Sequence, residues 1–412
     1  MDPSILLIVA GCFGFYMAFQ IGANDVANAM GTSVGSKAIT LKQAIVLAGI
    51  FELAGAILVG GHVTKTVGAG LIDMKQFLPR QYLYGMMSAL LSAAVWLNIA
   101  THFGLPVSTT HSIVGAVWGF GLVAAGPKAI VWGKVGQVIA SWFVSPVFGA
   151  LFAFLIFRVI HKRVFQSDEP IEATRRIAPW LVALIGFILT LTMVFKGLKH
   201  LKLDLSIGSA VAIGLGISVL SFFGAVFFFN RHTLESDGTS RGKFKAVEGM
   251  FRYLQIITAC FMAFAHGAND VANAIGPLAS IDAIVKAGAI TGKMDVALWI
   301  LVLGAFGIVI GLSIMGYKVI STVGEKITDM TPTRGFAAEF GAATTVVVCS
   351  KMGLPISTTH TLVGAVIGVG LARGMSALNM SVIKKVWVSW LATLPIAAAL
   401  TTGFYYTMIW LF

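Results

Sequence analysis

The chain contains 412 residues, of which 57% are hydrophobic and only 11% are charged. Soluble domains carry roughly 25% charged residues, so this composition excludes an ordinary soluble domain and indicates an integral membrane protein. The net charge of +12 does not require nucleic acid as a partner, because membrane proteins concentrate Lys and Arg in their cytoplasmic loops.

Apolar segments follow one another along most of the chain. A helix crosses the hydrocarbon core with roughly 20 mostly apolar residues, and several segments approach or exceed this length. The predicted spans are 4–21, 43–60, 82–100, 129–157, 177–195, 205–229, 250–265, 296–317, 335–350 and 386–411. Shorter apolar pieces, 112–125, 275–290 and 361–372, lie between them. We therefore predict an all-α membrane protein with about 10–12 transmembrane segments, including discontinuous or re-entrant helices.

Two loops, 158–176 and 230–252, hold many of the charged residues. Both mix basic residues with a few acids, which predicts a cytoplasmic location for both. The two spans between them return the chain to the same side, which leaves Lys196, Lys199 and Lys202 outside as a local exception. We expect a multi-pass protein of the plasma or inner membrane.

The first part of the chain is repeated in the last part. The stretch YMAFQIGANDVANAMG (16–31) matches FMAFAHGANDVANAIG (261–276), and GLPVSTTHSIVGAVWGFGL (104–122) matches GLPISTTHTLVGAVIGVGL (353–371). Duplicated halves with interrupted helices are the usual build of secondary transporters, whose binding site lies near the bilayer midplane between the halves. The predicted division is an N-terminal repeat 1–157, a connector 158–250 with two spans, and a C-terminal repeat 251–412.

The motifs PVSTTH (106–111) and PISTTH (355–360) place hydroxyls directly after a proline. Proline and a Ser or Thr cap are typical of a helix start, so each motif predicts a half-helix that begins inside the membrane. A helix N-terminus offers free N–H donors and partial positive charge, and two converging ends would suit a tetrahedral oxyanion. A single Ser-Thr-Thr could merely cap a kinked helix, but its recurrence at matched positions favours an anion site. The candidate anion-binding residues are Ser108, Thr109, Thr110, Ser357, Thr358 and Thr359.

The octapeptide GANDVANA occurs at 22–29 and again at 267–274. Its polar atoms are mainly acceptors, and a carboxylate with amide oxygens suits a hard cation, whereas transition metals prefer His or Cys. An ionised Asp near a bilayer centre costs about 2.5–3.5 kcal/mol, so each intramembrane Asp is a functional candidate. The alternative is that these Asp and Asn side chains only bond neighbouring helices. The candidate cation-binding residues are Asn24, Asp25, Asn28, Asn269, Asp270 and Asn273.

Two more acids lie in apolar spans, Glu52 in AGIFELAGA and Glu339 in GFAAEFGAA. No Lys or Arg stands beside either acid in the sequence. With the two motif aspartates, these acids make four carboxylates that lack enough fixed cations to neutralise them. A site with donors for an anion and surplus carboxylates for cations is electrically balanced only when both ions are present. Loading of one ion would then depend on the other, which is the physical basis of symport.

The doubled GANDVANA and P-[VI]-S-T-T-H blocks resemble the signature of the inorganic phosphate transporter (PiT) family. The resemblance covers both repeats and omits the connector. It implies symport of inorganic phosphate, with sodium in many members and protons in others, by inverted repeats and in a homodimer. It further implies that the Ser and Thr residues named above hold phosphate, that the six Asn and Asp residues hold sodium, and that Glu52 and Glu339 are acids required for transport. His266 also matches a family position, while the first repeat has Ile21 there.

Other carriers and other classes of protein fit part of the pattern. A proton-coupled carrier of phosphate or of a metal–phosphate complex, or a sulfate permease, would share the fold and the motifs. A channel would need a continuous polar path or a carbonyl filter, and two repeat-related sites suit alternating access better. An enzyme would need a nucleophile–base pair or a metal cluster, and the sequence shows neither grouping; His111 and His360 are interpreted as helix histidines with satisfied hydrogen bonds. The predicted partners are phosphate, sodium ions and membrane lipid, without nucleic acid and without a resident cofactor.

Overall fold

The computed structural model describes residues 3–60, 70–192, 194, 206–232, 237–290, 296–351 and 356–411. In these ranges the regular elements are helices, and an isolated bridge pairs Ile72 with Ile130. The all-helical fold expected from the sequence is confirmed. Several residues discussed above lie outside the described ranges: Lys196, Lys199, Lys202, residues 353–355 of the second motif, residues 193, 195 and 205 of two predicted spans, and residues 233–236 of the second charged loop.

The helices follow the predicted spans closely. In chain order the main helices are α1 (Pro3–Gly35), α2 (Leu41–Val59), α4 (Pro79–His102), α5 (Thr109–Ala125), α6 (Trp132–Ile160), α7 (Pro170–Thr192), α8 (Ile207–Arg231), α9 (Ser240–Asp270), α10 (Ala272–Ala287), α11 (Leu298–Met315), α12 (Tyr317–Ser321), α13 (Pro332–Lys351), α14 (Thr358–Arg373) and α15 (Met380–Leu411). Among the described residues, 8 helices are long and apolar enough to cross a membrane: α1, α2, α4, α6, α7, α8, α11 and α15. The predicted spans 250–265 and 335–350 lie within α9 and α13, which are long helices that carry charged side chains.

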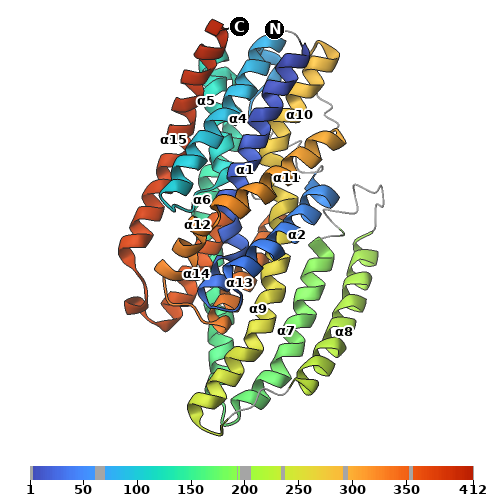
Figure 1. The fold of residues 1–412 in the computed structure, drawn as a ribbon, viewed down its shortest axis with the longest axis vertical. Helices are drawn as coiled ribbons and strands as arrows, with labels where there is room; N and C mark the ends of the chain where they lie inside the picture. Colours follow the sequence, from blue (N-terminus) through green and yellow to red (C-terminus); the bar gives the residue numbers. More distant parts are fainter. Residues whose placement is uncertain are drawn as a thin grey trace.

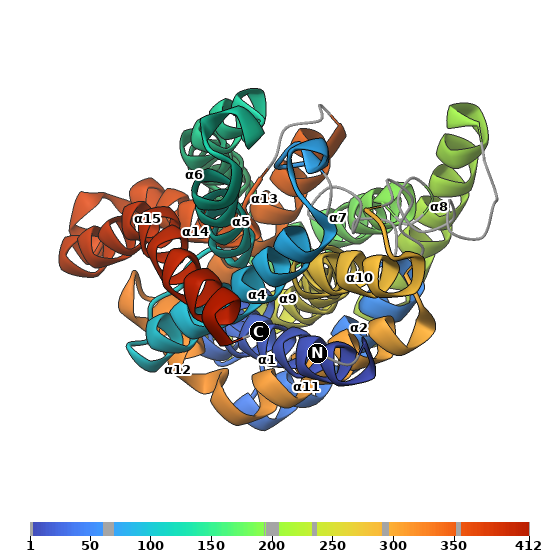
Figure 2. The same cartoon turned by 90° about the horizontal axis from the view of Figure 1, so that it is seen from above.

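Both chain ends lie at one end of the molecule, and the starts of α7 and α9 lie at the other (Figure 1). A salt bridge of 3.3 Å between Lys243 and Glu169 joins the two charged loops at this second end. The two charged loops therefore lie on one side of the molecule, as predicted. The connector helices α7 and α8 pack against each other beside α9, and α8 is mostly exposed at the edge of the bundle (Figure 2).

The two STTH motifs form the short helices that the sequence predicts. Helices α5 and α14 have 17 and 16 residues, so at 1.5 Å per residue each covers about 24–26 Å, less than the hydrocarbon core. Ser108 caps α5 by accepting a hydrogen bond from the backbone N–H of His111 (3.2 Å), and Ser357 caps α14 by accepting one from His360 (3.2 Å). Both serines are buried, so both helices begin inside the molecule.

The glycines that open the two GANDVANA motifs allow helices of different repeats to touch. A Cβ atom added to Gly22 would lie 1.9 Å from the carbonyl oxygen of Ile308 in α11, and one added to Gly267 would lie 2.1 Å from that of Glu52 in α2. Each motif therefore crosses a helix of the other repeat at backbone contact distance. The first motif is continuous within α1, whereas a turn at Val271 separates α9 from α10 within the second.

The substitution Gly267→Ala is expected to destabilise the protein, because the added methyl group would collide with the backbone of Glu52. Overpacking costs about 1–3 kcal/mol, and a backbone obstacle cannot rotate away as a side chain can. The matched control is Gly216→Ala in α8, where nothing lies within 4 Å of the added methyl group. Thermal unfolding in detergent measures both variants. If Gly267→Ala unfolded at the same temperature as the wild type, that result would contradict the close crossing of α9 and α2.

Candidate ion and anion site

Asp25 is at the centre of the candidate site, and its side chain is fully buried. Its Oδ2 accepts a hydrogen bond of 2.7 Å from the hydroxyl of Thr109, at the start of α5. Its Oδ1 accepts hydrogen bonds from the hydroxyl of Thr359, at the start of α14 (3.0 Å), and from the amide of Asn28 (2.9 Å). One carboxylate of the first repeat therefore joins the hydroxyls at the N-termini of both half-helices.

The motif asparagines reach across to the opposite repeat. Asn28 donates a hydrogen bond to the hydroxyl of Thr359 (2.8 Å), and Asn273 donates one to the hydroxyl of Thr110 (3.1 Å). Asn28 and Asn273 are matched positions of the two repeats, as are Thr110 and Thr359. Each asparagine therefore donates to the second threonine of the other repeat. The structure thus brings the predicted anion residues and the predicted cation residues into direct contact.

Asp270 occupies the position in the second motif that Asp25 occupies in the first. Its Oδ2 accepts a hydrogen bond from the hydroxyl of Thr358 (3.2 Å), and its Oδ1 accepts one from the amide of Asn269 (2.9 Å). Each motif Asp therefore binds the first threonine of its own repeat. Threonines, rather than the capping serines, make the contacts that link the two motifs.

Asn24 holds the chain that leads into α5. Its amide nitrogen donates to the hydroxyl of Thr101 (2.9 Å) and to the carbonyl of Leu105 (3.0 Å), and its side-chain oxygen accepts from the backbone N–H of Val107 (3.1 Å). These bonds fix the backbone immediately before the capped helix start. The sequence predicts a cation ligand here, and in this structure the polar atoms of the side chain bond to the chain before α5.

His266 lies among three buried carboxylates. Its Nε2 is 3.1 Å from Asp270 Oδ2 and 3.4 Å from Asp25 Oδ2, and its Nδ1 is 3.2 Å from Glu52 Oε1. One imidazole can carry at most one positive charge, so when all three carboxylates are ionised the cluster keeps a surplus of negative charge even with His266 protonated. The imidazole and the two aspartates also place one ligand atom each within 4.8 Å of one another. The sequence signalled this residue only through its match to a family position and the Ile21 at the corresponding place in the first repeat.

Glu339 lies apart from this cluster, in a second polar site between α1, α9 and α13. Its Oε1 accepts hydrogen bonds from the hydroxyls of Thr32 (2.5 Å) and Ser33 (2.7 Å) and from the amide of Gln255 (3.4 Å). The hydroxyl of Thr258 donates to its Oε2. The residue is fully buried, and among the described residues its recorded hydrogen bonds come from neutral groups. The four acids therefore divide into a cluster of three and a single carboxylate.

The histidines that end the STTH motifs lie side by side beneath the helix starts. The ring centroids of His111 and His360 are 4.8 Å apart, and the ring of His360 stacks on Trp390 at 3.7 Å. His111 Nε2 lies 3.4 Å from the hydroxyl of Ser141. In the described part of the chain the ring nitrogens of His360 have no hydrogen-bond partner. The expected hydrogen bonds are therefore not seen for His360 among the described residues, where its ring instead stacks on Trp390.

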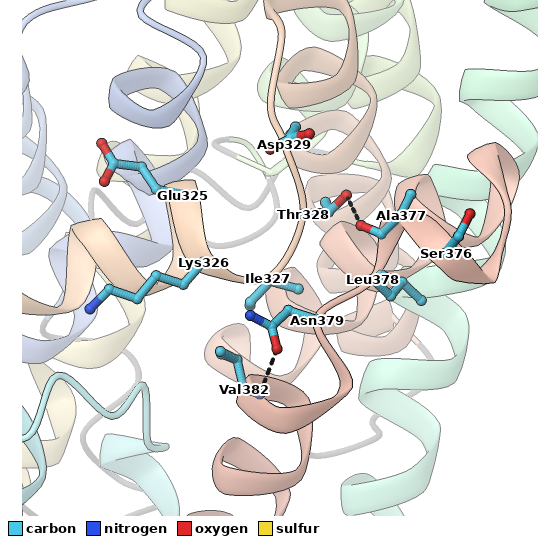
Figure 3. A pocket seen from close by; sticks show the side chains of 10 residues that line it. All are labelled: Glu325, Lys326, Ile327, Thr328, Asp329, Ser376, Ala377, Leu378, Asn379 and Val382. Carbon is cyan, nitrogen blue, oxygen red and sulfur yellow. Dashed lines mark hydrogen bonds between the residues drawn. The ribbon is translucent and has the colours of Figure 1, made fainter.

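The core site is closed in this structure, since Asp25, Asp270 and Thr359 are each at most 1% exposed. A cavity of about 420 Å³ lies elsewhere, between residues 325–329 and the start of α15 (Figure 3). The hydroxyl of Thr328 donates to the carbonyl of Ala377 across this cavity (2.8 Å), as Figure 3 shows. In the described part of the chain, these core side chains therefore present almost no surface to solvent.

The core site lies in the part of the chain that a known family shares. The family model described as "Phosphate transporter family" matches residues 21–401, which include most of both repeats and every residue of the core site. The chain belongs to the phosphate transporter family. As a member of the phosphate transporter family it is a multi-pass membrane protein and a transporter rather than an enzyme, which confirms those two predictions.

Relatives within the phosphate transporter family match over nearly the whole chain. A Haemophilus influenzae protein named "Putative phosphate permease" is 48% identical over 408 residues, which cover 98% of this chain and 97% of that protein. The "Inorganic phosphate transporter 2-1, chloroplastic" of Arabidopsis thaliana is 44% identical over 94% of this chain and 70% of its own length. A solved structure named "The sodium-dependent phosphate transporter" superposes with a TM-score of 0.90 at 40% identity, covering 99% of this chain and 100% of that one.

Proposed function

We propose that this phosphate transporter imports inorganic phosphate together with sodium ions. The observation that carries the proposal is the charge of the core, where three carboxylates surround one imidazole in a buried space. Uncompensated buried charge is strongly unfavourable, and bound cations would neutralise it. Carboxylate and amide oxygens suit a hard cation such as sodium. The name of the similar solved structure supports sodium as that cation.

Sodium is expected to bind before phosphate. The hydroxyls of Thr109 and Thr359 donate to Asp25, so they are not available to an anion in this state. A cation bound at Asp25 would occupy the carboxylate oxygens, release both hydroxyls and attract the anion. Phosphate would then be held by the four threonines of the two motifs and by the free N–H groups that begin α5 and α14. The capping serines would keep these two helix starts in place.

The remaining polar residues receive roles from their contacts. We assign the sodium ligands to the motif acids and amides, with Asn24 contributing through the position of α5. Glu52 would act as a coupling acid through His266, which lies between it and both motif aspartates. Glu339 would act as a coupling acid from the second polar site, where it connects α1 with α9 and α13.

Alternating access fits the bonds that cross between the repeats. The bond from Asn28 to Thr359 and that from Asn273 to Thr110 close the site from both halves, so opening the site would separate residues 1–157 from residues 251–412 at these contacts. In this proposal the N-terminal and C-terminal repeats form one midplane site, and the connector 158–250 stands outside it. The proposal includes a homodimer in the plasma or inner membrane, surrounded by lipid.

Uptake of radiolabelled phosphate into proteoliposomes tests the coupling ion. An inward sodium gradient is expected to drive uptake, while an inward proton gradient without sodium is not, because the site relies on cations at several oxygens rather than on one proton. Excess unlabelled sulfate is expected to compete poorly, since hydrogenphosphate can donate a hydrogen bond to a core carboxylate and sulfate cannot. Uptake driven only by protons, or displaced by sulfate, would favour the proton-coupled, metal–phosphate or sulfate alternative.

A further inference from the structure

A second cavity, of about 630 Å³, lies at the end of the molecule that holds the two charged loops, which the positive-inside rule predicts to be cytoplasmic. The end of α6 and the turn after it form one wall, and the start of α13 and the end of α14 form the other. The polar residues that line it are Arg158, His161, Lys162, Gln166, Arg334 and Arg373. Acidic side chains do not occur in this lining, which makes the cavity strongly basic.

The bases of this cavity are not neutralised by the salt bridges recorded in the described ranges. Glu169 pairs with Lys243, and Glu172 pairs with Arg175 and Arg176, so these loop acids serve other bases. Arg334 and Arg373 instead donate to the backbone carbonyl of Asp329, at 3.1 and 3.2 Å. The carboxylates of Glu248 and Asp329 lie near Arg334 and offset part of its charge, but neither is among the salt bridges of the described ranges. Glu248 accepts hydrogen bonds from the backbone N–H and the hydroxyl of Thr333.

Helix dipoles explain only part of this arrangement. Arg158 and Arg373 lie in the last turns of α6 and α14, where a cation is stabilised by the C-terminal partial charge. Arg334 lies in the first turn of α13, where the partial charge is positive and a cation is disfavoured. Arg334 lies beside Arg373 on one wall and faces Arg158 and Lys162 on the other, so an anion in the space between the walls would stabilise it.

We propose that this cavity binds a phosphate-bearing anion. Guanidinium groups match phosphate oxygens with paired hydrogen bonds, and the volume exceeds what one phosphate group needs. Two sources share this chemistry: the headgroup of an anionic phospholipid, and inorganic phosphate on the cytoplasmic side. Leu155 and Val159 line the cavity and are 48% and 59% exposed, so an acyl chain could continue from it along α6. Basic pockets between helices on this side of a membrane are typical lipid headgroup sites.

The cavity is separate from the core site. Helix α14 carries Thr358 at its start and Arg373 at its end, and this length of helix spans about 22 Å. The anion pocket and the core therefore occupy opposite ends of one rigid half-helix. The proposal does not depend on the coupling ion, because it concerns binding at the cytoplasmic end.

The test measures binding of two probes to purified protein. In phosphatidylcholine nanodiscs, retention of added phosphatidylglycerol is followed by native mass spectrometry, and inorganic phosphate is followed by equilibrium binding of the radiolabel. The pocket variant is Arg334→Gln with Arg373→Gln, and a second variant from the other wall is Arg158→Gln with Lys162→Gln. The matched control is Lys384→Gln with Lys385→Gln, which removes two exposed charges near the start of α15, outside the lining of this cavity. Thermal unfolding shows which variants fold.

If the ligand is the lipid headgroup, the wild type and the control are expected to retain phosphatidylglycerol. If the ligand is the free anion, they are expected to bind one more inorganic phosphate per chain than the pocket variant. In the folded pocket variants the affinity for that probe is expected to fall more than about tenfold, because a hydrogen bond to a charged group contributes about 1.5–3 kcal/mol. Loss of the lipid identifies the headgroup as ligand, and loss of one phosphate site identifies the free anion. Unchanged binding of both probes in either folded pocket variant would overturn the proposal.

Discussion

The substitution Asp25→Asn is expected to lower sodium-driven phosphate uptake by about a hundredfold or more. The Asp25 carboxylate accepts three hydrogen bonds and faces His266, and an asparagine would present an amide nitrogen to groups that also donate. Two lost charge-assisted bonds at about 1.5 kcal/mol each correspond to roughly a hundredfold. The variant would also remove one of the charges that attract sodium. Initial rates of radiolabelled uptake under a sodium gradient measure the effect.

A matched control is available in α10. Asp282→Asn makes the same chemical change to a buried acid that pairs with Lys286 at 2.7 Å, outside the core site. Lys286 is 62% exposed, so this pair contributes at most about 1 kcal/mol and uptake should remain close to that of the wild type. Comparable size-exclusion profiles would show that both variants fold. Sodium-driven uptake by Asp25→Asn at the rate of the control would refute the assigned role of Asp25.

The substitution Glu339→Gln is expected to lower uptake at least about tenfold while leaving phosphate binding at the core intact. Glu339 accepts hydrogen bonds from Thr32, Gln255 and Thr258, and so links α1 to α9 and α13. A glutamine would turn one acceptor oxygen into a donor, and a buried donor facing another donor costs about 1–3 kcal/mol. Transport requires these helices to move, so the rate should change more than the affinity for phosphate. Uptake and equilibrium binding, measured on the same preparation, separate the two effects.

Thr32→Ser serves as the control for this second acid. Serine keeps the hydroxyl that donates to Glu339 and removes only a methyl group, so uptake should stay within about threefold of the wild type. If Glu339→Gln transported phosphate as fast as Thr32→Ser, the carboxylate would have no part in coupling. If Glu339→Gln lost phosphate binding as well, the second polar site would act on the core directly.

The residues of the core were predictable because the chain contains each motif twice. A single STTH sequence is compatible with an ordinary helix cap, and Ser108 and Ser357 do act as caps. Recurrence after a proline in both repeats was the signal that two helix starts meet, and Thr109 and Thr359 do converge on Asp25. The short lengths of α5 and α14 also followed from their apolar runs.

The pairing of polar groups across the site was not predictable from the sequence. Asn24 was grouped with the cation ligands because it lies one residue before Asp25, yet its bonds go to residues some eighty positions further on. Glu52 and Glu339 looked alike as lone acids in apolar spans, but only Glu52 approaches His266. The partners of each polar side chain depend on which helices pack against each other. The hydrophobic periodicity of one segment carries no information about the helices that it contacts across the bundle.

The two backbone crossings have a consequence for the energetics of a transport cycle. At one crossing Gly22 meets the apolar Ile308 and follows Ile21, while at the other Gly267 meets the acidic Glu52 and follows His266. Two identical halves could exchange conformations without changing the free energy of the whole. In the proposed alternating-access cycle, the crossing of Gly267 would have to hydrate or shield the charges of Glu52 and His266 when it rearranges, whereas that of Gly22 and Ile308 would move apolar neighbours. The two halves would then differ in free energy, and this broken symmetry would give the empty carrier a preferred resting conformation.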